Sequence, residues 1–142
     1  MITSDLIVGI VCSRFNEQII EKISKACTSK LKDLGVRAEA IIYETVPGAL
    51  EIPIALQNII NNKGPDVLIA IGAVVRGDTY HFEVVSEQSA NGIMRVQLDN
   101  TVPIINAVLT TNTAEQALER VVIKGEEAAE AAIEMAIKFP KR

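Results

Sequence analysis

The chain has 142 residues, which fits one domain, and its net charge of −4 without any Lys or Arg cluster excludes a typical nucleic-acid-binding surface. Hydrophobic residues make up 49% of the chain but aromatic residues only 4%, so we expect an aliphatic core. Polar residues interrupt every apolar run before it reaches membrane-spanning length, so we expect no membrane partner. A single domain is therefore predicted over residues 1–142.

The first half of the chain alternates predicted strands with predicted helices. An apolar run predicts a strand over residues 6–12. Apolar residues at helical spacing then predict a helix over residues 16–34, with Asn16 as its N-cap. A second strand is predicted over residues 36–43 and a second helix over residues 49–62.

The second half continues this alternation. A third strand, buried on both faces, is predicted over residues 67–75, and a more polar helix over residues 80–98. A fourth strand is predicted over residues 104–109. A capping box then starts a helix over residues 113–122, and a glycine is expected to interrupt it before the last helix, residues 126–138.

This order of elements predicts the fold class. Strands that alternate with helices form a parallel sheet that is covered on both faces. We therefore expect an α/β fold, a single-domain three-layer sandwich with a central four-stranded parallel sheet. Hydrophobic periodicity does not predict the order of the four strands.

Cysteine usage and the first residues of the chain bear on its compartment. Cys12 and Cys27 lack the spacing of a metal or redox motif, so we expect two reduced, packed thiols and no metal site. The first residues also lack the basic start of a secretory signal peptide. We therefore expect a cytoplasmic protein.

Polar and charged residues follow each of the four predicted strands. They are found in residues 13–16, 44–51, 76–81 and 110–113. Because the carboxyl ends of parallel strands lie at one edge of a sheet, these side chains are expected to converge there. The sequence therefore predicts a ligand site at this edge.

His81, the only histidine, is expected in the first turn of the third helix, which Asp78 or Thr79 can cap. The free N–H groups and the dipole of a helix N-terminus favour an anion. The imidazole titrates near neutral pH and suits general acid/base catalysis, although a capping or packed histidine explains the residue equally well. This arrangement predicts chemistry on a phosphorylated or otherwise anionic small molecule.

Four other side chains each allow two interpretations. Phe15 can stack on a planar ligand or fold back on the first helix. Glu51 can accept hydrogen bonds from ligand hydroxyls or lie on a solvated helix face. Arg120 and Lys124, one helical turn apart, can clamp a phosphate or simply face solvent.

Several segments match a known family in its own order and over nearly the whole chain. The main ones are residues 13–16, 46–53, 70–82, 109–113 and 124–128. With them, the chain resembles the 6,7-dimethyl-8-ribityllumazine synthase family of riboflavin biosynthesis, which has a flavodoxin-like fold. The resemblance implies a transferase that condenses 5-amino-6-(D-ribitylamino)uracil with 3,4-dihydroxy-2-butanone 4-phosphate. Phosphate and water are released, and no cofactor is needed.

The resemblance also implies roles for individual residues. Phe15 would stack on the pyrimidine, which Val74 and Val75 would enclose. The residues implied to hold the ribityl chain are Ala49, Leu50 and Glu51. Those implied to bind phosphate are Gly77, Asp78, Thr79 and Arg120, while His81 would transfer protons.

Family members form pentamers, some of which assemble into a 60-subunit shell. In the family, Lys124 and Glu127 would complete the site of a neighbouring subunit, with Arg120 on its phosphate. Asn106 stands where the family often has an aromatic residue that also reaches that site, and the segment between Arg120 and Lys124 is shorter than usual. We expect a homopentamer and leave the shell open.

Three other functions fit parts of the sequence. A non-catalytic flavin- or lumazine-binding or shell-forming protein of the same fold would not need His81 beside Arg120. A riboflavin synthase that joins two lumazines would need no phosphate site. A flavodoxin-like signalling domain would carry carboxylates after the first strand, where this chain has Ser13-Arg14-Phe15.

Overall fold

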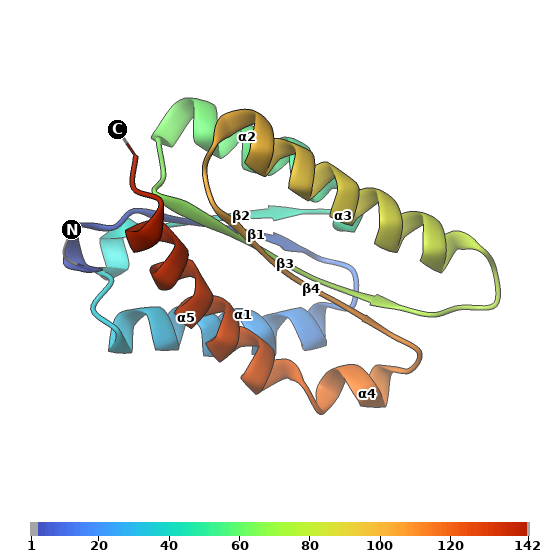
Figure 1. Cartoon of the computed structure of the whole chain (residues 1–142). Helices are drawn as coiled ribbons and strands as arrows, with labels where there is room; N and C mark the ends of the chain where they lie inside the picture. Colours follow the sequence, from blue (N-terminus) through green and yellow to red (C-terminus); the bar gives the residue numbers. More distant parts are fainter. Residues whose placement is uncertain (1–2, 142) are drawn as a thin grey trace.

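In the computed structural model, which describes residues 3–141, four parallel strands form one sheet between two layers of helices (Figure 1). The strands are β1 (Val8–Ser13), β2 (Ile41–Val46), β3 (Val67–Val75) and β4 (Ile104–Thr111). Their order is β2-β1-β3-β4, so β2 lies on one side of β1, while β3 and β4 follow on its other side. The predicted three-layer α/β fold with a parallel sheet is confirmed.

The helices divide between the two faces of the sheet. In Figure 1, α2 (Ile52–Lys63) and α3 (His81–Asn100) lie above the sheet. The helices α1 (Glu17–Asp33), α4 (Ala114–Leu118) and α5 (Val121–Lys138) lie below it. Each face has its own aliphatic core, because the inward side chains of a buried parallel strand alternate between the two layers.

The prediction that a glycine ends the helix before residue 126 is wrong. The helix that starts at the capping box of Thr113 and Gln116 is α4, which ends at Leu118, and α5 then continues through Gly125. A Cβ atom at Gly125 would lie 2.5 Å from the backbone oxygen of Ile23 and 2.9 Å from the backbone nitrogen of Cys27. This glycine therefore permits close packing of α5 on α1 rather than interrupting a helix.

The second strand begins later than predicted, at Ile41 instead of residue 36. Gly35 has a φ of 106°, and the N–H of Val36 donates to the backbone oxygen of Leu31 at 3.0 Å. These contacts close the C-terminus of α1, so Val36 still belongs to the helix end. A short 3₁₀ turn, Ala38–Ala40, follows before the chain enters the sheet.

Both cysteines are buried and free, as predicted. Burial raises the pKa of both thiols, and the pKa of Cys27 reaches about 12. Neither thiol is therefore poised as a nucleophile at neutral pH. Within residues 3–141, no helix combines the length and the apolar character that crossing a bilayer requires.

Candidate active site

A cavity of about 480 Å³ opens at the carboxyl edge of the sheet, where β1, β2 and β3 end. It lies beside the point at which the strand order reverses, the usual ligand position in an open parallel sheet. Nine residues singled out from the sequence line it: Phe15, Ala49, Leu50, Glu51, Val74, Val75, Gly77, Thr79 and His81. The predicted convergence of the strand ends is confirmed for these residues.

The turn after β1 presents Phe15 to this cavity. Its side chain is 74% exposed, so the ring is not folded back into the core. Asn16 is the N-cap residue of α1, as predicted, but its side chain makes no bond to the helix. Its amide Nδ2 instead donates to the backbone oxygen of Ala73 at 3.0 Å, and its backbone has a φ of 64°. This bond ties the turn that carries Phe15 to β3.

The segment after β2 supplies a carboxylate at the cavity. Gly48 is extended, and the N–H of Glu51 donates to its backbone oxygen at 3.1 Å, which closes the 3₁₀ turn Ala49–Glu51. A Cβ atom at Gly48 would lie 3.2 Å from Oε1 of Glu51, so a larger residue would crowd that carboxylate. Glu51 is exposed, and no described residue forms an ion pair with it. It can therefore accept hydrogen bonds from a ligand.

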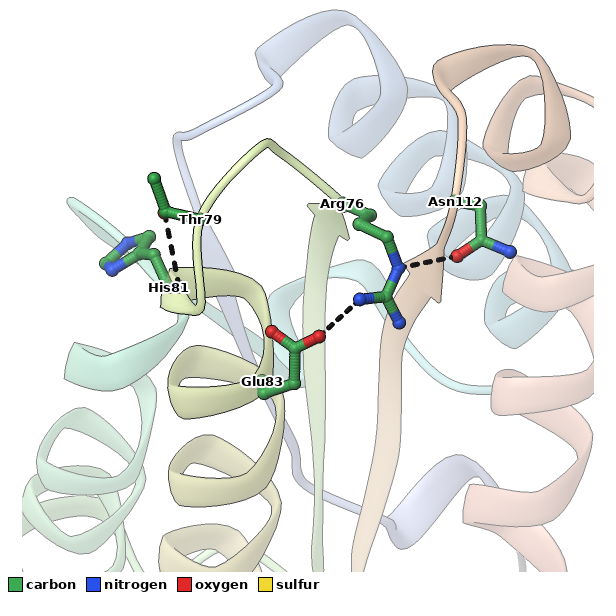
Figure 2. A network of polar contacts seen from close by, with 5 residues as sticks. All are labelled: Arg76, Thr79, His81, Glu83 and Asn112. Atoms are coloured by element: carbon green, nitrogen blue, oxygen red, sulfur yellow. Dashed lines mark hydrogen bonds and ion pairs between the residues drawn. The ribbon is translucent and has the colours of Figure 1, made fainter.

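The loop between β3 and α3 places His81 at the first residue of α3, as predicted. The N-cap of α3 is Tyr80, without a side-chain capping bond, so the prediction that Asp78 or Thr79 caps the helix is wrong. Oγ1 of Thr79 instead accepts a hydrogen bond from the N–H of His81 at 3.3 Å (Figure 2). Residues 77–81 are all exposed. The N-terminus of α3 and the imidazole are thus both at the cavity.

Arg76, at the end of β3, makes contacts that the sequence did not predict. Its Nε donates to Oδ1 of Asn112 at 2.8 Å, and its Nη1 forms an ion pair with Glu83 (Figure 2). The guanidinium carbon lies 4.3 Å from the centre of the Phe82 ring. A hydrogen bond to its own backbone, then the hydrogen bond from Arg76 and the Arg76 charge, lower the pKa of Glu83. No spacing rule in the sequence pairs residues 76, 83 and 112.

The remaining predicted residues do not line this cavity. Asp78 lies in the same loop, exposed and outside the lining. Asn106 lies on β4 and borders a second cavity of about 510 Å³ between β4 and α3. The other three, Arg120, Lys124 and Glu127, lie at or within the start of α5, on the opposite face of the sheet from α3.

The cavity combines four chemical functions in one place. It offers an exposed aromatic ring for stacking, a carboxylate for hydroxyl groups, a helix N-terminus for an anion and an imidazole for proton transfer. Its lining from the described part of the chain contains no lysine or arginine. The cavity of one chain therefore lacks the cation that a phosphate group favours.

The chain is similar to proteins of one family along almost its whole length. The family model described as 6,7-dimethyl-8-ribityllumazine synthase matches residues 5–139. A protein of that name from Nitrosospira multiformis is 56% identical over 132 residues, which cover 93% of this chain and 82% of that protein. Proteins of the same name from Burkholderia mallei and Burkholderia pseudomallei are 54% identical over 129 residues, covering 91% of this chain and 75% of theirs.

Proposed function

Since the chain belongs to the 6,7-dimethyl-8-ribityllumazine synthase family, we propose that its cavity at the carboxyl edge is where the two substrates of that reaction meet. The enzyme is a transferase of riboflavin biosynthesis. It condenses 5-amino-6-(D-ribitylamino)uracil with 3,4-dihydroxy-2-butanone 4-phosphate and releases phosphate and water. The observation that carries the proposal is the joint lining of one cavity by Phe15, Glu51, Thr79 and His81.

The pyrimidine substrate occupies the part of the cavity between the turns that follow β1 and β2 and the end of β3. Its ring stacks on Phe15 and lies against Val74 and Val75. Its ribityl hydroxyls run along the turn of Ala49 and Leu50 and donate to the Glu51 carboxylate. This orientation leaves the amino group of the ring directed toward the loop that follows β3.

The butanone phosphate binds at that loop. Backbone N–H groups of residues 77–79 and the N-terminus of α3 receive its phosphate. The carbonyl carbon then lies near the pyrimidine amine, and holding both reactants together supplies much of the rate. His81 removes and returns protons as the imine forms, phosphate leaves and the ring closes. The reaction needs no cofactor in this scheme.

A second copy of the chain supplies the missing cation. Arg120 and Lys124 do not line the cavity of their own chain, which suits residues that act in a neighbour's site. Exposed apolar side chains on α2, α3 and α5 support such an assembly, with Ile54 75%, Leu98 68% and Ile123 58% exposed. We propose a homopentamer in which Arg120, Lys124, Glu127 and Asn106 face the next subunit's cavity.

The chain acts as one domain over residues 1–142 and works in the cytoplasm. The continuous sheet and its two helical layers support one folding unit, because each layer packs on the same four strands. The two free thiols, Cys12 and Cys27, suit a reducing compartment.

Co-expression of two variants tests this arrangement. His81→Ala and Arg120→Ala chains, each with low activity alone, are co-expressed and purified as one assembly. Where sites are shared, some contain both a His81 and a neighbour's Arg120, so activity rises above the sum of the two separate variants. Activity that only equals this sum would contradict a shared site.

An unchanged KM for the butanone phosphate in Arg120→Ala would remove Arg120 from phosphate binding.

A further inference from the structure

We propose that Arg76 is a positioning residue for the condensation, which holds the loop of residues 77–80 and the first turn of α3 in their active arrangement through Glu83 and Asn112. This inference rests on the proposed function of the cavity. It concerns side chains that do not line the cavity themselves.

The guanidinium of Arg76 joins three elements at the carboxyl edge. Its Nη1 pairs with Glu83 on α3, and its Nε donates to Asn112, which directly follows β4, at 2.8 Å. The backbone N–H of Arg76 also donates to the oxygen of Thr111 at 2.9 Å. One side chain at the end of β3 therefore fixes both the end of β4 and the start of α3.

These contacts leave Arg76 poorly placed to bind phosphate. Two of its nitrogens already have acceptors, and its plane lies over the Phe82 ring at 4.3 Å. Glu83 also neutralises its charge. Its chain neighbour Gly77 and the stacked Phe82 line the cavity, but Arg76 does not. The geometry thus favours a support behind the site over a direct ligand.

The loop needs such a support because little else holds it. Residues 77–81 are all exposed, and a Cβ atom at Gly77 would meet no atom within 4 Å. A loop without buried side chains opens at low free-energy cost. The pair of Arg76 and Glu83 closes this segment by joining its two ends, seven residues apart.

The same pair controls the direction of His81. Figure 2 shows that His81 and Glu83 leave the first turn of α3 on opposite sides. The contact of Glu83 with Arg76 therefore holds that turn from behind, while His81 faces the cavity. Loss of the contact would allow this turn and the phosphate-binding N–H groups to shift together. Small displacements of reacting groups reduce rates strongly.

Steady-state kinetics of Arg76→Lys and Glu83→Gln test the proposal in the assembled full chain. Lysine keeps the positive charge but not the planar fork that contacts Glu83 and Asn112 together. We expect the KM for the butanone phosphate to rise roughly tenfold in Arg76→Lys, with the KM for the pyrimidine within about twofold. Arg95→Lys is the matched control, since its pair with Asp99 on α3 has an N–O distance of 3.5 Å and is highly exposed.

A second measurement does not depend on turnover. Amide hydrogen exchange of residues 77–82 is expected to be faster in Arg76→Lys and in Asn112→Ala, which removes only one of the Arg76 contacts, than in the control Arg95→Lys. Exchange in the core strands is expected to be the same in all three variants. A purely structural role would instead lower thermal stability and the active fraction, leaving both KM values unchanged.

The outcomes separate the two proposals. If the wild type forms lumazine but the variants keep the KM values and the loop hydrogen exchange of the wild type, the positioning role alone is overturned. A lower KM for the butanone phosphate in Glu83→Gln would also overturn it, because a freed Arg76 would then be a phosphate ligand. No lumazine from the wild type would overturn the proposed function and the positioning role with it.

Discussion

The two helical layers of the molecule differ most at the carboxyl edge of the sheet, where only the layer of α2 and α3 borders the candidate site. On one face, α5 lies so close to α1 that Gly125 has no room for a side chain. Alanines complete this contact: Ala128, Ala129, Ala132 and Ala136 are at most 3% exposed. On the other face, α3 also comes close to α2 at Gly92, where a Cβ atom would lie 2.6 Å from Cγ of Pro53, but a cavity opens at the rim of the sheet.

This difference separates stability from chemistry. The layer of α1 and α5 contains small residues that fix the distance between helices, so changes there should act on the free energy of unfolding. The rim beside α2 and α3 contains exposed polar and aromatic residues, so changes there should act on catalysis with little effect on folding. Substitutions between α1 and α5 should therefore lower the free energy of unfolding, whereas substitutions at the rim should lower activity and leave stability nearly unchanged.

The largest effect is expected for His81→Ala. Loss of a general acid/base should lower kcat about 100-fold while leaving turnover above the uncatalysed background, because positioning of the substrates remains. The free energy of unfolding should stay within about 0.5 kcal/mol, since His81 is exposed. Lumazine formation and denaturant unfolding of the same preparation check both parts. An unchanged kcat would remove His81 from the mechanism.

Gly125→Ala tests the packed layer. The added methyl group would lie 2.5 Å from a backbone oxygen of α1, which cannot move without the helix. We expect a loss of about 2 kcal/mol in the free energy of unfolding, even after the better helix propensity of alanine. Gly77→Ala is the control for stability, because open space surrounds that position. Equal unfolding free energies for the two variants would contradict the contrast between the layers.

Phe15→Ala tests whether a change at the rim affects substrate binding without affecting stability. Loss of a stacking ring should raise the KM for the pyrimidine about tenfold and leave the KM for the butanone phosphate nearly unchanged. Stability should change little because the ring is 74% exposed. Phe139→Ala, which removes another exposed ring, serves as the control for both constants. A rise in both KM values by the same factor would indicate a general disturbance of the rim.

The smallest effect is a pH dependence in the packed layer. Burial favours the neutral thiol of Cys27 and raises its pKa from 9.0 to about 12, so the unfolded chain loses this proton first as pH rises. Stability is thus full below pH 9 and declines above it, by about 1 kcal/mol at pH 10 for this thiol. Unfolding of the wild type and Cys27→Ala at pH 7 and pH 10 measures the difference. An equal decline in both proteins would contradict this assignment.

The sheet and most of the cavity could be predicted from the sequence because strong local patterns coincide there. The buried run of residues 67–75 matches β3, and polar residues after β1, β2 and β3 converge at the cavity, whereas residues 110–113 do not line it. The errors lie where tertiary contacts override local signals. Gly125 was expected to interrupt a helix because its local preference gives no sign of the packing partner on α1. Asn16 is the N-cap residue of α1, as expected, but its side chain bonds to β3 instead of to the helix.

The support of the candidate site was less predictable than its lining. Arg76, Glu83 and Asn112 come from three elements, and only the tertiary structure brings them together. The strand order that makes β1 and β3 neighbours was likewise absent from the hydrophobic pattern. The position of Arg120 away from its own cavity also depends on the fold, since its separation in sequence from Lys124 says nothing of the sheet face on which α5 lies.

The most direct test of the central claim is a condensation assay with the purified protein. The two substrates are mixed with it while lumazine fluorescence and free phosphate are followed together against an uncatalysed control. We predict protein-dependent product that saturates with each substrate, phosphate release in step with lumazine, and a large loss of rate in His81→Ala. A folded protein that binds the lumazine tightly but never forms it above background would contradict the account and favour a non-catalytic binding protein.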